Sequence, residues 1–130
     1  MESGEPVTTD FPLPDECRPI FVVRRPTCWS EGSLDGTLTV VNDSPYTFDG
    51  VTAEILLEVE RGVLITWKAL LKPLVANSTI DDAILETMPP DLTLPSNVDP
   101  GHGTITVTLR DRRGRFLGRG GAEVEVIAPP

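Results

Sequence analysis

The sequence predicts an all-β fold, a β-sandwich of about seven antiparallel strands. Three observations predict it. Short apolar blocks are rich in Val, Ile, Leu and Thr, apolar and polar side chains alternate within several of them, and clusters of Gly, Pro, Asn or Asp separate them at intervals of roughly 8–15 residues. That spacing is typical of a sandwich rather than of a helical bundle or an α/β fold. The predicted strands are 18–25, 34–41, 51–60, 63–71, 78–86, 103–110 and 115–127.

The chain is long enough for one domain. It has 130 residues, and with its 11 glycines included about 47% of it is apolar, which is the usual share for a globular domain. Residues 1–16 are acidic and rich in proline, and they carry neither helical nor alternating periodicity, so they are predicted to form a disordered tail or linker. The single domain is expected to cover residues 17–130.

The first predicted strand, 18–25, begins and ends beside proline and separates Cys17 from Cys28. An extended strand at about 3.3 Å per residue would hold the two Cα atoms roughly 30 Å apart, whereas a disulfide needs about 4.4–6.8 Å. Both thiols are therefore expected to be free. This suits a reducing compartment and slightly favours the cytoplasm.

Period-two alternation supports the next strands. Leu38 and Val40 alternate with threonines, and 51–60 places its apolar residues on one face and most of its charges on the other. In 63–71 the side chains of Val63, Ile65 and Trp67 share one face, so Trp67 is expected to be buried. The blocks 103–110 and 115–127 alternate in the same way.

Two regions leave alternatives open. Residues 67–71 and 80–86 are also compatible with helix by propensity. Residues 87–100 are rich in proline and have no evident element, so they are predicted to form a long connection. A structureless loop of about fourteen residues is unusual in a compact domain, and it suggests a crossover between sheets or a function.

Charge and hydropathy exclude several classes. The net charge of −9 argues against general affinity for nucleic acid, whose phosphates favour a basic face. No window approaches the roughly 18 apolar residues of a membrane span, and no basic start followed by an apolar run marks a secretory signal. The expected protein binds neither membrane nor nucleic acid.

The sequence offers no catalytic, cofactor-binding or metal-binding set. The only histidine, His102, falls in the glycine turn 99–103 and is expected to be a solvated turn residue. Residues 118–121 (GRGG) lack the spacing of a dinucleotide-binding loop, and a bulge or tight bend in the last strand explains them better. Asp81 and Asp82 would point to opposite faces of a strand, so they would not share a metal ion. The protein is therefore expected not to be an enzyme.

One local charge anomaly is the candidate site. Five of the eleven basic residues fall within ten positions, at the hairpin between the last two strands. They are a docking patch for an acidic surface or an anion, or else a solvated hairpin tip whose charges discourage edge pairing. Only Phe116 lies near them for stacking on a nucleic-acid base. Carbohydrate is kept as a weaker candidate partner, because the few aromatic residues define no platform for it. The five candidate partner-binding residues are Arg110, Arg112, Arg113, Arg115 and Arg119.

Several segments together resemble a known family. Residues 38–45 (LTVVNDSP), 49–55 (DGVTAEI), 67–68 (WK) and 75–79 (VANST) are similar to the immunoglobulin-like accessory domain of glycoside hydrolase family 2 enzymes, β-mannosidases in particular. The segment 18–20 resembles the lead into such a domain. The resemblance covers roughly residues 18–86.

This resemblance implies a seven-stranded immunoglobulin-like or fibronectin III-like sandwich packed beside a catalytic barrel that lies elsewhere in a longer chain. The catalytic carboxylates of the barrel have no matching positions here, so none is carried over. Antibody-type immunoglobulin domains are disfavoured, because Cys28 and Trp29 are neighbours and no cysteine follows them.

Two functional hypotheses follow from the sequence. In the first, the chain is a non-catalytic module accessory to a larger glycoside hydrolase-like protein. In the alternative, it is a stand-alone interaction or structural protein that binds a protein partner through the arginine hairpin or through an exposed edge such as 18–25.

Overall fold

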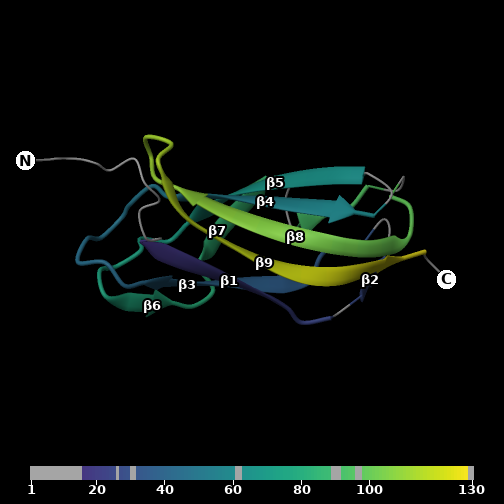
Figure 1. The fold of residues 1–130 in the computed structure, drawn as a ribbon, viewed down its shortest axis with the longest axis horizontal. Coiled ribbons are helices and arrows are strands. Elements are labelled where there is room, and N and C mark those ends of the chain that lie inside the picture. Colours follow the sequence, from purple (N-terminus) through teal and green to yellow (C-terminus); the bar gives the residue numbers. More distant parts are fainter. Residues whose placement is uncertain are drawn as a thin grey trace, which may run out of the picture.

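The computed structural model describes residues 16–25, 27–29, 32–60, 63–88, 92–95 and 98–128, and these residues are all-β. They form nine strands in two sheets, without an α-helix (Figure 1). In chain order the strands are β1 (Cys17–Val23), β2 (Thr27–Trp29), β3 (Gly36–Asn42), β4 (Thr52–Val59), β5 (Val63–Leu71), β6 (Ser78–Ile80), β7 (Ile84–Met88), β8 (Gly101–Arg110) and β9 (Phe116–Ile127).

The two sheets differ in size and shape. One has three strands in the order β1-β3-β6, and the other has six in the order β2-β9-β8-β4-β5-β7. Neighbouring strands are antiparallel, except that β2 runs parallel to β9. The six-stranded sheet curls into a half-barrel, which is how a strongly twisted sheet wraps around a core.

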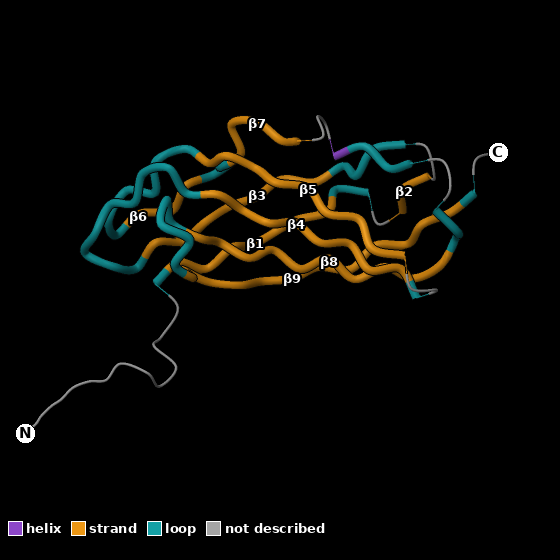
Figure 2. Tube along the Cα trace, turned by 90° about the horizontal axis from the view of Figure 1, so that it is seen from above, coloured by secondary structure: helices purple, strands orange, loops and turns teal. Residues whose placement is uncertain are grey.

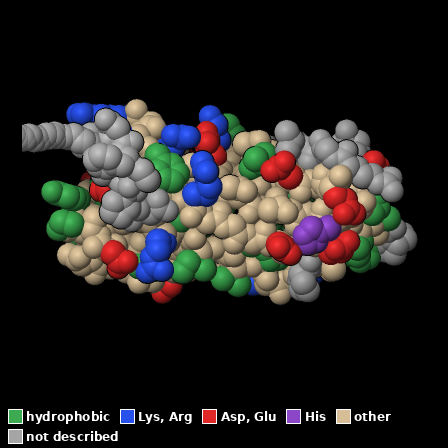
Figure 3. All heavy atoms as spheres, in the orientation of Figure 1, with side chains coloured by type: hydrophobic (Ala, Val, Ile, Leu, Met, Phe, Trp, Pro, Cys, Tyr) green, Lys and Arg blue, Asp and Glu red, His purple; other side chains and the backbone are tan. Residues whose placement is uncertain are grey.

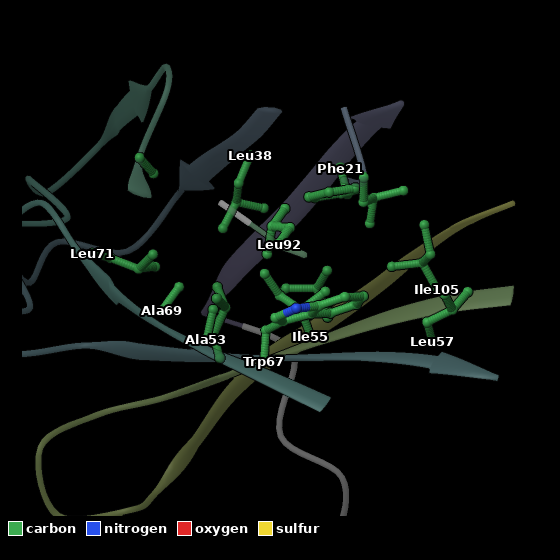
Figure 4. Packing of buried hydrophobic residues seen from close by; sticks show 14 of the residues in the cluster. Phe21, Leu38, Ala53, Ile55, Leu57, Trp67, Ala69, Leu71, Leu92 and Ile105 are labelled. Carbon is green, nitrogen blue, oxygen red and sulfur yellow. The ribbon is translucent and has the colours of Figure 1, made fainter. Parts of the chain in front are cut away.

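The core lies between the two sheets and follows the predicted alternation. In β4 every second side chain from Ala53 to Val59 is buried. Figure 4 shows Phe21 and Leu38 of the three-stranded sheet facing Ile55 and Trp67 of the other sheet. The side chain of Trp67 is fully buried, as predicted, and its Nε1 donates a hydrogen bond to the carbonyl oxygen of Thr93 at 3.1 Å. The aromatic ring is therefore packed and its polar atom satisfied.

Most predicted strands are present, with ends that differ by up to two residues. The helical alternatives for 67–71 and 80–86 are wrong. The single strand predicted over 78–86 is also wrong, because the chain bends at Asp81 and Asp82 and divides that segment between the two sheets. Asp82 has a φ of 48°, in the left-handed region, and the next amide, that of Ala83, donates to the Leu38 carbonyl at 2.8 Å. This bend takes the chain out of the three-stranded sheet.

The segment 87–100 is not a structureless connection where the structure describes it. Strand β7 continues to Met88, and three apolar side chains beyond it are buried. Leu94 donates a backbone hydrogen bond to Gly32, and Leu34 donates one to Leu92. Residues 92–95 therefore close one side of the core. The buried side chains are Leu92, Leu94 and Val98.

The irregularity that the sequence suggested for the last strand, β9, lies directly before its glycines, where the register places Leu117 outside the pairing with β8. The register with β8 is continuous from Gly118 to Gly121 and shifts only before it, next to Phe116. A Cβ atom on Gly118 would overlap the carbonyl oxygen of Cys17, and one on Gly120 would overlap that of Pro19. These two glycines are thus required because β1 lies directly against β9.

Asn42 fastens the end of β3 to the loop that follows β5. It is fully buried, and its Nδ2 donates to the carbonyl oxygens of Leu74 at 2.9 Å, Tyr46 at 2.9 Å and Val75 at 3.2 Å. Its Oδ1 accepts hydrogen bonds from the backbone nitrogen and the hydroxyl of Ser44. Asn42 is therefore a buried structural link between loops, and Ser44 satisfies its side-chain oxygen.

Replacing Gly120 by alanine should destabilise the fold by about 3 kcal/mol or more, because the added carbon cannot fit without moving β1. Gly114→Ala is the matched control. It has a φ of 86° and nothing within 4 Å of the added carbon, so only backbone strain of about 1 kcal/mol is expected. Urea unfolding measures both. Equal losses in the two variants would show that β1 does not press on β9.

Both cysteines are free, as predicted, and both are buried. Burial, assisted by the negative charge of Glu16, raises the pKa of the Cys17 thiol to about 11. Burial also raises the pKa of the Cys28 thiol. At about pH 8, N-ethylmaleimide should leave both thiols unmodified in the folded protein and label both after unfolding without reductant. Mass spectrometry counts the labels, and rapid labelling of the folded protein would contradict this packing.

Candidate interaction surface

Strands β8 and β9 are joined by a tight turn that carries the candidate arginines. Asp111 and Gly114 begin and end a four-residue β-turn, in which the Gly114 amide donates to the Asp111 carbonyl at 2.9 Å. The Asp111 carboxylate also accepts hydrogen bonds at 2.9 Å from the backbone amides of Arg113 and Arg115. Aspartate at the first position and glycine at the fourth, here with a positive φ, are the residues that such a turn favours.

Arg115 ties this turn to the start of β1. Its Nη1 lies 2.6 Å from Oε1 of Glu16, and its Nε lies 3.3 Å from Oδ2 of Asp111. Its guanidinium also lies over the ring of Phe48, 5.9 Å from the centroid. Arg115 therefore has a structural role, because its charge is already matched by two carboxylates.

Arg110 and Arg119 are also engaged within the protein. The Arg110 Nε lies 3.6 Å from Oε1 of Glu54, and its Nη1 donates to the Gly114 carbonyl at 3.2 Å. The Nε of Arg119 donates to the Thr108 hydroxyl at 3.3 Å, and its guanidinium lies over the ring of Phe116. Both side chains remain partly exposed at the edge of the turn.

Arg112 and Arg113 differ from the other three. Both are exposed at the tip of the turn, and within the described part of the chain neither guanidinium forms an ion pair or a hydrogen bond. Arg112 lies beside Gly50, and together with Arg113 it lines a shallow hollow of about 400 Å³ that also contains Phe48, Asp49 and Asp111. The structure thus separates Arg110 and Arg115, which brace the turn, and Arg119, which joins β9 to β8, from the two that extend from the turn, which we call the tip arginines.

The opposite end of the same face is acidic. His102 was expected in a turn but lies within β8, where its Nε2 is 3.3 Å from Glu123 and its Nδ1 is 3.8 Å from Glu125. The turn prediction was wrong because the flanking glycines take part in strand pairing with β9. Figure 3 shows Lys and Arg side chains at one end of this face and the histidine among acidic side chains at the other.

Two further predictions concern positions away from the hairpin. Strand β1 is an edge strand of the three-stranded sheet, as the sequence suggested for 18–25, but the carbonyl groups of Cys17 and Pro19 at its beginning face β9. Among the described residues, no group of three or more His, Cys, Asp or Glu side chains is placed to hold a metal ion. Asp81 accepts a hydrogen bond from the Thr39 hydroxyl.

No described helix is long and apolar enough to cross a membrane.

Sequence reasoning missed the acidic partners of the hairpin. The Asp-x-x-Gly pattern at 111–114 is a turn signal that would have identified Asp111. Nothing local could have identified Glu16, because it lies 99 positions from Arg115 and was assigned to the tail.

No model of a known protein family matches this sequence, and no curated protein matches it either.

The carboxyl of Asp111 should make the turn sensitive to acid. Partial burial alone would raise its pKa, but the amides of Arg115 and Arg113 and the Arg115 guanidinium hold it below the ordinary value of 3.8. A lowered pKa in the folded state stabilises the protein above the pKa of the unfolded chain, and this contribution is lost as pH falls through the folded value.

Asp111→Asn should therefore be less stable than the unmodified protein at about pH 6, and the difference should shrink toward about pH 2.5. Urea unfolding at several pH values measures it. A stability difference that does not change with pH would show that the carboxylate charge has no part in holding the turn.

Proposed function

We propose that this chain is a non-catalytic interaction module with an immunoglobulin-like or fibronectin III-like β-sandwich fold, and that its tip arginines bind an acidic surface of a protein partner or adjacent domain. The observation that carries this proposal is the division of the arginines. Arg110 and Arg115 hold the turn in place, and Arg119 joins β9 to Thr108 on β8. Arg112 and Arg113 extend from the turn, and neither guanidinium has an ion pair or a hydrogen bond among the described residues.

The strand order supports the fold assignment. One sheet has the order β1-β3-β6, and the other contains β9-β8-β4-β5. In an immunoglobulin-like arrangement, strands A and B are neighbours in one sheet, and strands G, F and C are neighbours in that order in the other. Strands β1 and β3 correspond to A and B, and strands β9, β8 and β4 correspond to G, F and C. β1 pairs antiparallel with β3. Directly after β1 the chain passes to the other sheet, where β2 pairs with the last strand, β9, before the chain returns to form β3. The additional edge strand β7 is a departure from the seven-stranded pattern.

The charge distribution supports an acidic target. The chain carries a net charge of −9, so an acidic partner is repelled by most of its surface. Two adjacent guanidinium groups at an exposed turn are a local exception, and guanidinium groups are the charged groups best suited to bidentate binding of carboxylates. Such a contact would orient the partner as well as attract it.

The setting we propose is an accessory domain of a larger glycoside hydrolase-like protein. The segments that resemble those domains lie together, since the amide of Asn77 donates to the carbonyl of Ser44 and Asn42 joins both loops through Leu74 and Val75. Detecting the native polypeptide in its source cells with an antibody to this domain tests the setting. A mass of several hundred residues agrees with it, and a band near 14 kDa contradicts it.

An acidic peptide tests the tip arginines directly. A fluorescein-labelled deca-glutamate should bind the protein with an anisotropy change that weakens as salt is added, because exposed charges are screened. The double variant Arg112→Ser/Arg113→Ser should lose about tenfold or more in affinity, since two charge-assisted contacts are removed. Far-ultraviolet circular dichroism should be unchanged, because neither side chain braces the turn.

The matched control is Arg24→Ser/Arg25→Ser, which removes the same charge from a different exposed position near the end of β1. This variant should keep the affinity. Equal losses in both double variants would mean that the peptide responds to net charge alone, and that result would overturn the assignment to the hairpin.

A further inference from the structure

Strand β7 has an open side. Among the described residues it pairs with β5 alone and ends the six-stranded sheet, and Figure 2 shows it at the margin of the molecule. The Leu71 amide donates to the carbonyl of Val51, the residue before β4, so the backbone groups of Leu70 face β7 and pair with Glu86. Because backbone direction alternates along a strand, the N–H and C=O of Thr87 point away from the sheet. An edge of this kind is a template for another strand.

A groove runs beside this edge. Its volume is about 610 Å³, and it lies between β7 and the start of β3. Strand β6 pairs only with Val40 to Asn42, so the first part of β3 is not covered by β6 on this side. The groove contains the apolar side chains of Leu34, Ile84 and Leu92. An extended chain paired with β7 would direct alternate side chains toward these residues.

Exposed apolar side chains surround the same strand. Leu85 is 56% exposed and Met88 is 76% exposed, both on β7, and Leu70 on the neighbouring strand is 40% exposed. A second hollow, lined by Leu70, Met88 and Thr87, lies along the β5–β7 pair. Apolar side chains gathered around an unpaired edge mark a surface for contact with another chain.

The charges of the groove select the occupant. Three carboxylates line it, and one of them, that of Asp35, is already paired with Arg24 and Arg25, which leaves two to attract a basic ligand. A second copy of the chain would bring a further net charge of −9 to this acidic edge, which opposes self-association. A basic segment would be attracted instead. The carboxylates belong to Asp35, Asp82 and Glu86.

We propose that an extended, lysine- or arginine-rich segment of a partner protein binds here by adding a strand to the free edge of β7. Main-chain hydrogen bonds to Thr87 provide affinity, and the groove carboxylates provide selectivity for basic side chains. This site is separate from the tip arginines, and it prefers the opposite charge.

A heptapeptide of alternating lysine and valine, labelled with fluorescein, tests the proposal by anisotropy on the intact chain. The same peptide with glutamate in place of lysine should not bind at β7, so any signal that it gives should be insensitive to Thr87→Pro and be lost in Arg112→Ser/Arg113→Ser. Thr87→Pro should weaken binding by about tenfold, because proline removes the outward N–H that the added strand would use. The β5–β7 ladder does not need that N–H, and edge strands tolerate proline at such positions.

Charge is tested by Glu86→Lys, with Glu123→Lys as the matched control on the outer face of β9. Both variants alter the net charge equally. Glu86→Lys should weaken binding of the basic peptide about fivefold, and Glu123→Lys should leave it nearly unchanged. If Thr87→Pro loses its strand-type circular dichroism, that variant is unfolded, and the comparison of Glu86→Lys with Glu123→Lys then tests the proposal by itself.

Different results test binding at the tip arginines and strand addition at β7, so either proposal can fail without the other. Arg112→Ser/Arg113→Ser should leave binding of the basic peptide unchanged, whatever it does to the acidic one. Three results would overturn strand addition at β7: no binding of the basic peptide, equal weakening by Glu86→Lys and Glu123→Lys, or a dimer in light scattering that Thr87→Pro converts to a monomer. The last result would assign the edge to a second copy of the chain.

Discussion

The arrangement of both sheets depends on the direct contact between β1 and β9. The carbonyl groups of Cys17 and Pro19 occupy the space that side chains would fill at Gly118 and Gly120. This contact brings the edge of the three-stranded sheet onto the last strand of the six-stranded sheet, and β2 then pairs with that same strand. Because glycines alternate with Arg119, the inner positions stay empty while the arginine extends toward solvent at the base of the hairpin. One short sequence, Gly-Arg-Gly, therefore serves both packing and the charged surface.

The sequence predicted the strands that alternate over their whole length. Strands such as β4 and β8 bury mainly one face. In a half-buried strand, apolar and polar side chains alternate with a period of two, and this alternation remains recognisable when a single residue departs from it. It did not predict the division between β6 and β7, because that break is made by a backbone bend at two aspartates and not by glycine or proline. Strand β2 has three residues, too few for any period to be recognised, and its place is set by pairing with a strand about a hundred positions away.

The position of the candidate surface could be predicted from the sequence, but the contacts of its arginines could not. Five arginines within ten positions are visible in the sequence, and the structure places all five at or beside one turn. Their division into bracing and projecting groups follows from contacts with Glu16, Glu54 and Phe48, which lie far from them in the chain. Local patterns cannot reveal such pairs. The edge at β7 was missed for a related reason, since an unpaired strand is defined by the neighbours that it lacks in space.

The contact between β1 and β9 is tested most directly by native-state amide hydrogen exchange, measured residue by residue. If β1 is locked by its carbonyl contacts with Gly118 and Gly120, its hydrogen-bonded amides should open with the same free energy as those in the middle of β9, through global unfolding. If β1 were a loosely attached edge, its amides would exchange at least about tenfold faster than those of β9 while the rest of the six-stranded sheet stayed protected. That second result would contradict the account.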